Sequence, residues 1–309
     1  MTFYAFMGAV EAGLIFGLVA IGVYLSFRVL DFPDLTVDGS FPLGAAVAAV
    51  LITSGVNPFL ATAIAVAAGF VAGYITATLH IRLNILNLLA SILVMLALFS
   101  INLRIMGRPN LPLLSSETVF SPLKALSAPS YMTIPVALAV VVAAGKLVLD
   151  WFLATEIGLA LRAAGANARM ASAQGIDRNR MLPLGLGISN SYTALAGALF
   201  AQSQGFADVG MGIGIIIVGL AAVIVGETII SPRTVLLATL SAIVGSLIYR
   251  IVLAFALNLD QIGLRAQDLN LVTALLIVLA LSLARARGSS FPKLRAARAA
   301  SKKEQQGNA

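Results

Sequence analysis

The chain has 309 residues, of which 60% are hydrophobic and only 11% are charged, and its formal net charge is +7. Soluble domains carry about 25% charged residues, so this composition excludes an ordinary soluble protein. Apolar runs of roughly 20 residues recur along the chain, which predicts an all-α, polytopic bundle of about 8–10 transmembrane helices. The absence of cysteine excludes disulfides. Most basic residues lie in loops and in the tail, where they set membrane topology and do not indicate nucleic-acid binding.

The first predicted span covers residues 3–27 and contains Glu11. No Lys or Arg precedes Arg28 and the apolar run is long, so we expect a retained span and not a cleaved signal peptide. Residues 28–41 are too polar to face lipid, and proline and glycine interrupt them. We therefore expect irregular backbone there, shielded by protein or lining a cavity. The apolar run at 42–53 is too short to span a membrane comfortably alone.

Three longer spans follow this broken region. In residues 60–79, small residues recur at every fourth position, a pattern that favours close helix packing: Ala61, Ala65, Gly69, Gly73 and Ala77. A span over residues 83–103 would place Asn84, Asn87 and Ser91 on one helix face. A loop rich in proline and serine, residues 104–130, leads to the span predicted at 131–153.

The longest polar interruption between apolar runs is residues 154–182. Within it, Asn167 is a good helix N-cap, residues 168–174 favour a helix, and Gly175 suits the position just past a helix end. Small residues in this stretch would let another surface approach closely: Ala164, Gly165, Ala166, Ala171 and Ala173. The pattern predicts a short helix outside the bilayer that docks a partner protein. An ordinary basic loop is the alternative.

Four further apolar runs complete the bundle at residues 183–201, 211–225, 235–257 and 269–284. The basic tail, residues 285–309, is expected to be cytoplasmic and disordered. The same positive-inside rule places the stretch 154–182 in the cytoplasm, and the four spans between it and the tail agree with that. The resulting topology has nine membrane segments, one of them short, and an external N-terminus.

Several polar side chains in or beside the apolar runs are candidates for lining a translocation path: Glu11, Asp34, Thr36, Asp38, Ser40, Asn84, Asn87, Asn190 and Arg250. Glu11 and Arg250 lie deepest in the apolar runs. A salt bridge between them is the first interpretation and a role on the path is the second. The alternating polar residues 34–40 either line a path or cap a helix beginning near Phe41. The Asn84, Asn87 and Ser91 face is more typical of hydrogen bonding between helices than of substrate contact.

Some chemistries are disfavoured. A single histidine and no cysteine argue against a zinc site. The chain lacks the G-x-x-x-x-G-K-[ST] motif, so if ATP drives it, another subunit binds the nucleotide. No Ser/His/Asp or paired-carboxylate arrangement stands out. We therefore predict neither an enzyme active site nor a cofactor in this chain.

Two motifs resemble those of a known family. The pattern G-x-A-x-R-A-x-G-x-N at residues 158–167, continued by Met170-Ala171 and Gly175-Ile176-Asp177, resembles the cytoplasmic coupling loop of ABC importer permeases of the branched-chain amino acid and ribose type. The run D-L-T-V-D-G-S at residues 34–40 is similar to the family's D-L-[ST]-V-G-S element, with Asp38 inserted before the glycine. Its L-T-V-D-G-S-F-P-L-G form looks like the subgroup labelled tryptophan/tyrosine-type permeases.

The resemblance covers about residues 1–284 and implies a machine of several subunits. They are two permease subunits, expected here as a homodimer, two cytoplasmic ATPase subunits that hold ATP and Mg²⁺, and an extracytoplasmic solute-binding protein. It also implies that the coupling loop docks into the ATPase, through Arg162, Gly165, Asn167, Met170, Ala171, Gly175, Ile176 and Asp177. The expected location is the bacterial cytoplasmic (inner) membrane.

The function predicted from the sequence is therefore a permease subunit that forms the path for an amino acid or a similar small solute. The alternative is a secondary transporter or channel that works alone. That alternative needs ionisable groups inside the membrane. Only Glu11, and Glu227 near the end of a span, are available, and no facing pair of carboxylates is evident.

Overall fold

The computed structural model describes residues 3–124, 130–230 and 232–257, together with Leu275, Val278 and Ser282. The predicted helical bundle is confirmed, and only two short strands accompany the helices in this part of the chain. The elements in chain order are α1 (Phe3–Val23), η1 (Tyr24–Val29), α2 (Thr36–Thr53), α3 (Pro58–Leu83), α4 (Asn87–Met106), β1 (Asn110–Pro112), α5 (Ser121–Lys124), α6 (Ser130–Ala154), α7 (Glu156–Ala166), α8 (Ala168–Ala173), α9 (Arg178–Gln204), β2 (Phe206–Asp208), η2 (Val209–Gly212), α10 (Ile215–Ile229) and α11 (Val235–Leu257).

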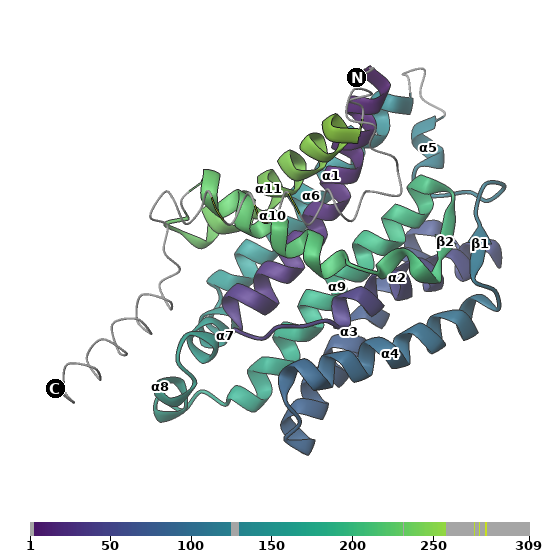
Figure 1. Cartoon of the computed structure of the whole chain (residues 1–309). Helices are drawn as coiled ribbons and strands as arrows, with labels where there is room; N and C mark the ends of the chain where they lie inside the picture. Colours follow the sequence, from purple (N-terminus) through teal and green to yellow (C-terminus); the bar gives the residue numbers. More distant parts are fainter. Residues whose placement is uncertain are drawn as a thin grey trace.

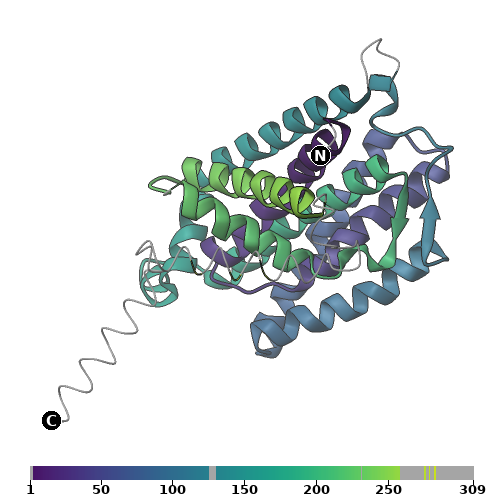
Figure 2. The ribbon, with the colours of Figure 1, turned by 45° about the horizontal axis from the view of Figure 1, so that its top comes forward.

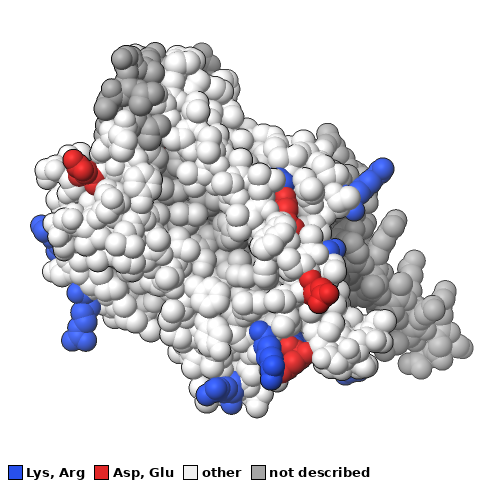
Figure 3. Space-filling model, turned by 180° about the vertical axis from the view of Figure 1, so that it is seen from behind, with Lys and Arg blue, Asp and Glu red and all other residues white. Residues whose placement is uncertain are grey.

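Length and composition identify the membrane helices. Within the described residues, seven helical segments are long and apolar enough to cross a bilayer. In Figure 3, charged side chains lie mostly towards the two ends of the molecule, and a broad uncharged area separates them. This is the surface that a multi-pass membrane protein presents to lipid. The span predicted at 269–284 lies outside the described residues apart from three helical positions, and so does the tail 285–309.

The molecule has two distinct ends (Figure 1). At one end, here the α8 end, lie α7, α8 and the turn between α3 and α4. At the other, here the hairpin end, β1 pairs with β2 in antiparallel register, with Leu111 opposite Ala207. Figure 2 shows the strands and α8 at opposite sides from a second direction. The long helices run between these ends (Figure 1). They include α9, which covers the span predicted at 183–201 but is not one of the seven apolar segments.

Helix α9 runs through the middle of the bundle and packs on α2 and α3 (Figure 1). The small-residue stripe predicted in the third membrane segment lies at this contact, and all five of its residues are buried. A Cβ added at Gly69 would lie 2.5 Å from the carbonyl oxygen of Asn190, and one at Gly73 would overlap that of Leu186. The two helices therefore touch backbone to backbone, as the stripe predicted.

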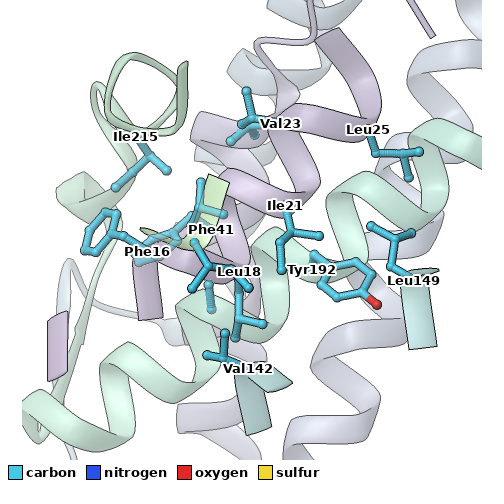
Figure 4. Packing of buried hydrophobic residues seen from close by; sticks show 14 of the residues in the cluster. Phe16, Leu18, Ile21, Val23, Leu25, Phe41, Val142, Leu149, Tyr192 and Ile215 are labelled. Carbon is cyan, nitrogen blue, oxygen red and sulfur yellow. The ribbon is translucent and has the colours of Figure 1, made fainter. Parts of the chain in front are cut away.

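A hydrophobic core surrounds α1, whose residues from Gly13 onward are almost all buried. Figure 4 shows the α1 side chains Phe16, Leu18 and Ile21 among residues from α2, α6 and α9, including Phe41 and Tyr192. The Tyr192 hydroxyl donates a 2.7 Å hydrogen bond to the carbonyl oxygen of Gly145, so the polar group of this buried side chain is satisfied. The first predicted span is thus a central helix of the bundle.

The broken region is shorter than predicted. Irregular backbone covers only residues 30–35, where it is shielded by protein: Phe32 and Asp34 are buried. Helix α2 begins at Thr36, not near Phe41, because the Asp34 side chain accepts a 3.0 Å hydrogen bond from the Thr36 amide at its start. It continues through Pro42 to Thr53 and becomes an 18-residue span.

Two other boundaries also differ from prediction. Asn84 has a left-handed backbone, with φ of 51°, at the end of α3, and α4 begins only at Asn87. The expected shared face of Asn84, Asn87 and Ser91 is therefore wrong, because a turn separates Asn84 from the helix that carries the other two. The polar stretch 154–182 contains two helices, α7 and α8, where one was predicted, and α9 begins within it at Arg178.

Candidate functional site

Side-chain caps shape the turn at the α8 end. Asn167 ends α7 and starts α8 with extended backbone, and its Oδ1 accepts a 3.1 Å hydrogen bond from the Met170 amide. Gly175 follows α8 with φ of +82°, a conformation that favours glycine. Asp177 then caps α9 by accepting a 2.9 Å bond from the Asn179 amide. The predicted cap, short helix and terminating glycine are confirmed.

The residues predicted to dock an ATPase divide into two groups. Exposed ones are Asn167, Met170, Gly175 and Asp177, while Arg162 and Ile176 are half-buried. Gly165 instead lies against η1, where an added Cβ would overlap the carbonyl oxygen of Val29. Ala164 and Ala171 are also buried, at 4% exposed each. For Ala164, Gly165 and Ala171, the surface that approaches closely belongs to this chain, and their docking to an ATPase stays a prediction.

A wide, shallow pocket of about 710 Å³ opens beside the turn. Its wall combines exposed basic side chains with backbone, and it is lined by Ala168, Arg169, Ser172, Gly175, Ile176, Asp177, Arg178 and Asn179. Arg180 pairs with Asp177 at 3.2 Å on the same surface. A surface of this kind suits contact with another protein and offers no enclosed site for a small ligand.

The turn is connected to the interior by α7. Gly158 and Gly165 hold α7 close to the end of α6 and to η1, respectively. At the end of η1, Arg28 forms an ion pair with Glu227 near the end of α10, and both side chains are half-buried. From the sequence, Glu227 was considered only as an ionisable group for a secondary transporter. These contacts connect the turn through α7 and η1 to α10.

Asn84 and Asn87 lie at the α8 end, beside the turn between α3 and α4. They line a pocket of about 230 Å³ between the α3–α4 turn and the start of α9, with His80, Ile81, Ile85, Leu86, Arg178, Asn179 and Leu182. The His80 ring stabilises this turn through a 2.6 Å hydrogen bond between Nδ1 and the carbonyl oxygen of Ile85.

Asp34, Ser40 and Asn190 form one buried hydrogen-bonded network. The Asn190 amide nitrogen donates to Asp34 Oδ2 at 2.7 Å, and its oxygen accepts from the Ser40 hydroxyl at 2.7 Å. Thr36 is 2.8 Å from Thr76 on α3, hydroxyl to hydroxyl. All are 1% exposed or less. Their burial and complete pairing favour a packing role for these four predicted path residues.

Asp38 has a specific role that the sequence did not reveal. Its carboxylate accepts hydrogen bonds from the amides of Gly214, at 3.1 Å, and Ile216, at 2.7 Å, at the start of α10. A helix start presents unpaired N–H groups and a partial positive charge, so a carboxylate there is stabilising. Asp38 thereby fastens α2 to α10 across 176 residues of sequence. The only signal in the sequence was an acidic residue inserted into an otherwise familiar motif.

The salt bridge expected between Glu11 and Arg250 is not formed. Glu11 accepts a hydrogen bond from Ser203 on α9. The Arg250 guanidinium lies over the Phe16 ring, 3.8 Å from its centroid. The two side chains leave α1 and α11 towards different neighbours, and so they do not meet.

No group of three or more His, Asp or Glu side chains in the described residues is arranged to hold a metal ion.

Comparison with known proteins identifies the family. Residues 5–281 match the model of the branched-chain amino acid transport system permease component. The chain is 43% identical over 265 residues to a protein named tyrosine transport system permease protein from Clostridioides difficile (strain R20291), covering 86% of each. It is 35% identical over 278 residues to an uncharacterised protein of Rickettsia prowazekii (strain Madrid E), covering 89% of this chain and 95% of that one. No solved structure matches. This chain is a member of the branched-chain amino acid transport system permease family.

Proposed function

We propose that this chain is the permease subunit of an ATP-binding-cassette importer in a bacterial cytoplasmic membrane. Residues 1–284 would form the permease domain and 154–182 its cytoplasmic coupling loop. The observation that carries the proposal is the capped turn at the α8 end, whose outer surface is exposed while its inner surface packs against the bundle. The permease would work with cytoplasmic ATPase subunits, an extracytoplasmic solute-binding protein and a second, identical permease subunit.

The contacts within the chain suggest how movement of the ATPase subunits reaches the membrane helices. When the ATPase subunits close on ATP, they would pull on the exposed Asn167, Met170 and Asp177. Gly165 would pass the motion to η1, and Arg28 would pass it through Glu227 to α10. Rigid-body movement of this kind alternates access to a path at the interface between permease subunits. This chain would supply the translocation path and the turn on which the ATPase subunits pull, and ATP would be hydrolysed on the ATPase subunits.

The substrate we propose is an amino acid, with tyrosine as the first to test, because a relative of 43% identity is named for tyrosine transport. The experiment reconstitutes the permease, the ATPase and the binding protein in vesicles and measures radiolabelled tyrosine uptake. ATP-driven uptake that requires all three proteins is expected. Uptake driven by an ion gradient with the permease alone would instead establish the secondary transporter.

A matched pair of glycines tests the coupling turn. Gly175 and Gly55 have φ of +82° and +85°, and an added Cβ would meet nothing within 4 Å at either position. Gly175 lies at the α8 end and Gly55 in the α2–α3 turn at the hairpin end. Replacement by valine strains both turns alike. We expect Gly175→Val to lower uptake at least about tenfold while the permease stays in the membrane, because a displaced turn transmits less of the ATPase motion.

Gly55→Val serves as the control, with uptake expected to remain within about twofold of wild type. ATP hydrolysis per tyrosine imported should rise only in Gly175→Val. Equal uptake by the two variants would remove the coupling role of the turn.

A further inference from the structure

Arg250 is a cation without a counter-ion in the described part of the bundle. It lies on α11, seven residues before the helix ends, and its half-buried side chain rests on Phe16 of α1. Its Nε is buried and has no hydrogen-bond acceptor, and none of the ion pairs among described residues includes it. A charge within a membrane bundle is costly unless something compensates it. The contact with Phe16 offsets only part of that cost.

Glu11 is the complementary group nearby. It is half-buried on α1, and its carboxylate is held by the Ser203 hydroxyl and by no cation in the described residues. Two residues further on, Gly13 lies against α11, where an added Cβ would be 3.5 Å from the Cβ of Arg250. Opposite charges on two touching helices thus remain apart, each oriented by a different neighbour. Neither charge is neutralised by an opposite charge among the described residues, so each is available to pair with a ligand that carries both charges.

Aromatic rings lie next to these two groups. The rings of Phe16, Phe41 and Phe200 contact one another with centroids 5.7 to 5.9 Å apart. Figure 4 shows Phe16 and Phe41 side by side near Ile215, at the start of α10. Phe200 is half-exposed and lies one turn from Ser203 on α9, so the ring that touches Phe16 and the hydroxyl that holds Glu11 share a helix face.

We infer that Arg250 and Glu11 bind the carboxylate and the ammonium group, respectively, of a zwitterionic α-amino acid on its way through the permease. A guanidinium matches a carboxylate through two parallel N–H···O bonds. This inference rests on the proposed function and assigns roles to residues within it.

The test uses the complete transporter in vesicles, with tyrosine as the probe. The variants are Arg250→Gln and Glu11→Gln, and the control is Arg104→Gln, an exposed arginine at the end of α4. Both uptake and ATP hydrolysis stimulated by the loaded binding protein are measured. Each of the first two variants should lose at least about tenfold in uptake while hydrolysis stays within about twofold, because each loses a charge-assisted bond to substrate. Arg104→Gln should change neither.

Three results would overturn the inference. One is wild-type uptake in Arg250→Gln. Another is an equal fall of uptake and hydrolysis, which means a structural role. The third is a loss that appears only in vesicles rich in anionic lipid, which assigns Arg250 to a lipid headgroup. If Arg250→Gln does not assemble, Arg250→Lys decides: it keeps the charge without the paired donors, and it should raise the ATP hydrolysed per tyrosine. An unchanged ratio there rejects the site.

The proposed function fails in a different way. A wild-type complex that imports no amino acid refutes the importer and this site with it. A wild-type complex that imports tyrosine, with Arg250→Gln matching it, refutes the site alone.

Discussion

The contact between α3 and α9 and the attachment of α10 to the bundle are built on opposite principles. At the first, glycines bring two backbones together, and Gly69 and Gly73 face the carbonyl groups of α9 directly. At the second, charged groups hold both ends of the helix: Asp38 binds its start and Arg28 pairs with Glu227 near its end. Close packing has one arrangement, whereas ion pairs can break and re-form. We therefore expect α3–α9 to be the fixed part and α10 the part that moves.

The largest effect is expected from Gly73→Val, which places a side chain in the close contact between α3 and α9. Its new side chain would overlap the Leu186 carbonyl, and neither backbone can yield because both are inside long helices. We predict that the variant does not accumulate as folded protein. An overlap with main-chain atoms costs more than the roughly 1–3 kcal/mol typical of an overpacked side chain, and should exceed about 4 kcal/mol. Yield and thermal unfolding in detergent measure this. Gly8→Val, where an added Cβ meets nothing within 4 Å, is the control. A stable Gly73→Val protein would show that the contact is adaptable.

The buried network beside that contact should give the next effect. Asn190→Leu leaves the Asp34 carboxylate buried without its 2.7 Å donor, which should cost about 2–4 kcal/mol of folding stability. The double variant Asp34→Asn/Asn190→Asp restores the donor and acceptor across the pair. It should therefore recover part of the loss. Unfolding in detergent distinguishes the two variants, and no recovery in the double variant would argue that the network is not what stabilises this site.

At the attachment of α10, Asp38→Asn removes the charge from the helix start. An amide can still accept from Ile216, but its NH₂ group faces the Gly214 amide, so about 1–2 kcal/mol should be lost. We expect uptake to change several-fold while the protein remains folded. The backbone amides of α10 should then be the first to exchange hydrogen faster. Exchange spread evenly over the bundle would contradict a local attachment.

The smallest effect is expected from Glu227→Gln. Breaking the half-buried pair with Arg28 should cost about 0.5–1 kcal/mol at the end of α10 and alter the uptake rate more than the unfolding temperature. Asp177→Asn is the control for stability alone, because its pair with Arg180 is more exposed, with side chains 51% and 83% accessible. That control should leave stability nearly unchanged. An unfolding temperature lowered equally by the two variants would remove the distinction between the two pairs.

Local features were predictable from sequence because neighbouring residues determine them. The Asn167 cap, the α8 helix and the Gly175 terminator follow from side-chain chemistry within one turn. The stripe from Ala61 to Ala77 follows from helical periodicity. Boundaries failed where a side chain acted beyond its own segment, as when Asp34 started α2 five residues before Phe41.

By itself, the sequence determined the membrane class, the approximate positions of the described spans and the turn at the α8 end, because hydrophobic length and capping are properties of short segments. Only the tertiary structure decided the partners of the polar residues. Asp38 binds the start of α10, 176 residues away in the sequence. Asp34 accepts a hydrogen bond from Asn190, 156 residues away, and Arg28 pairs with Glu227, 199 residues away. The reason is physical: polar groups inside a bundle must be satisfied by whichever helix packs beside them, and that neighbour is set by packing and not by the adjacent sequence.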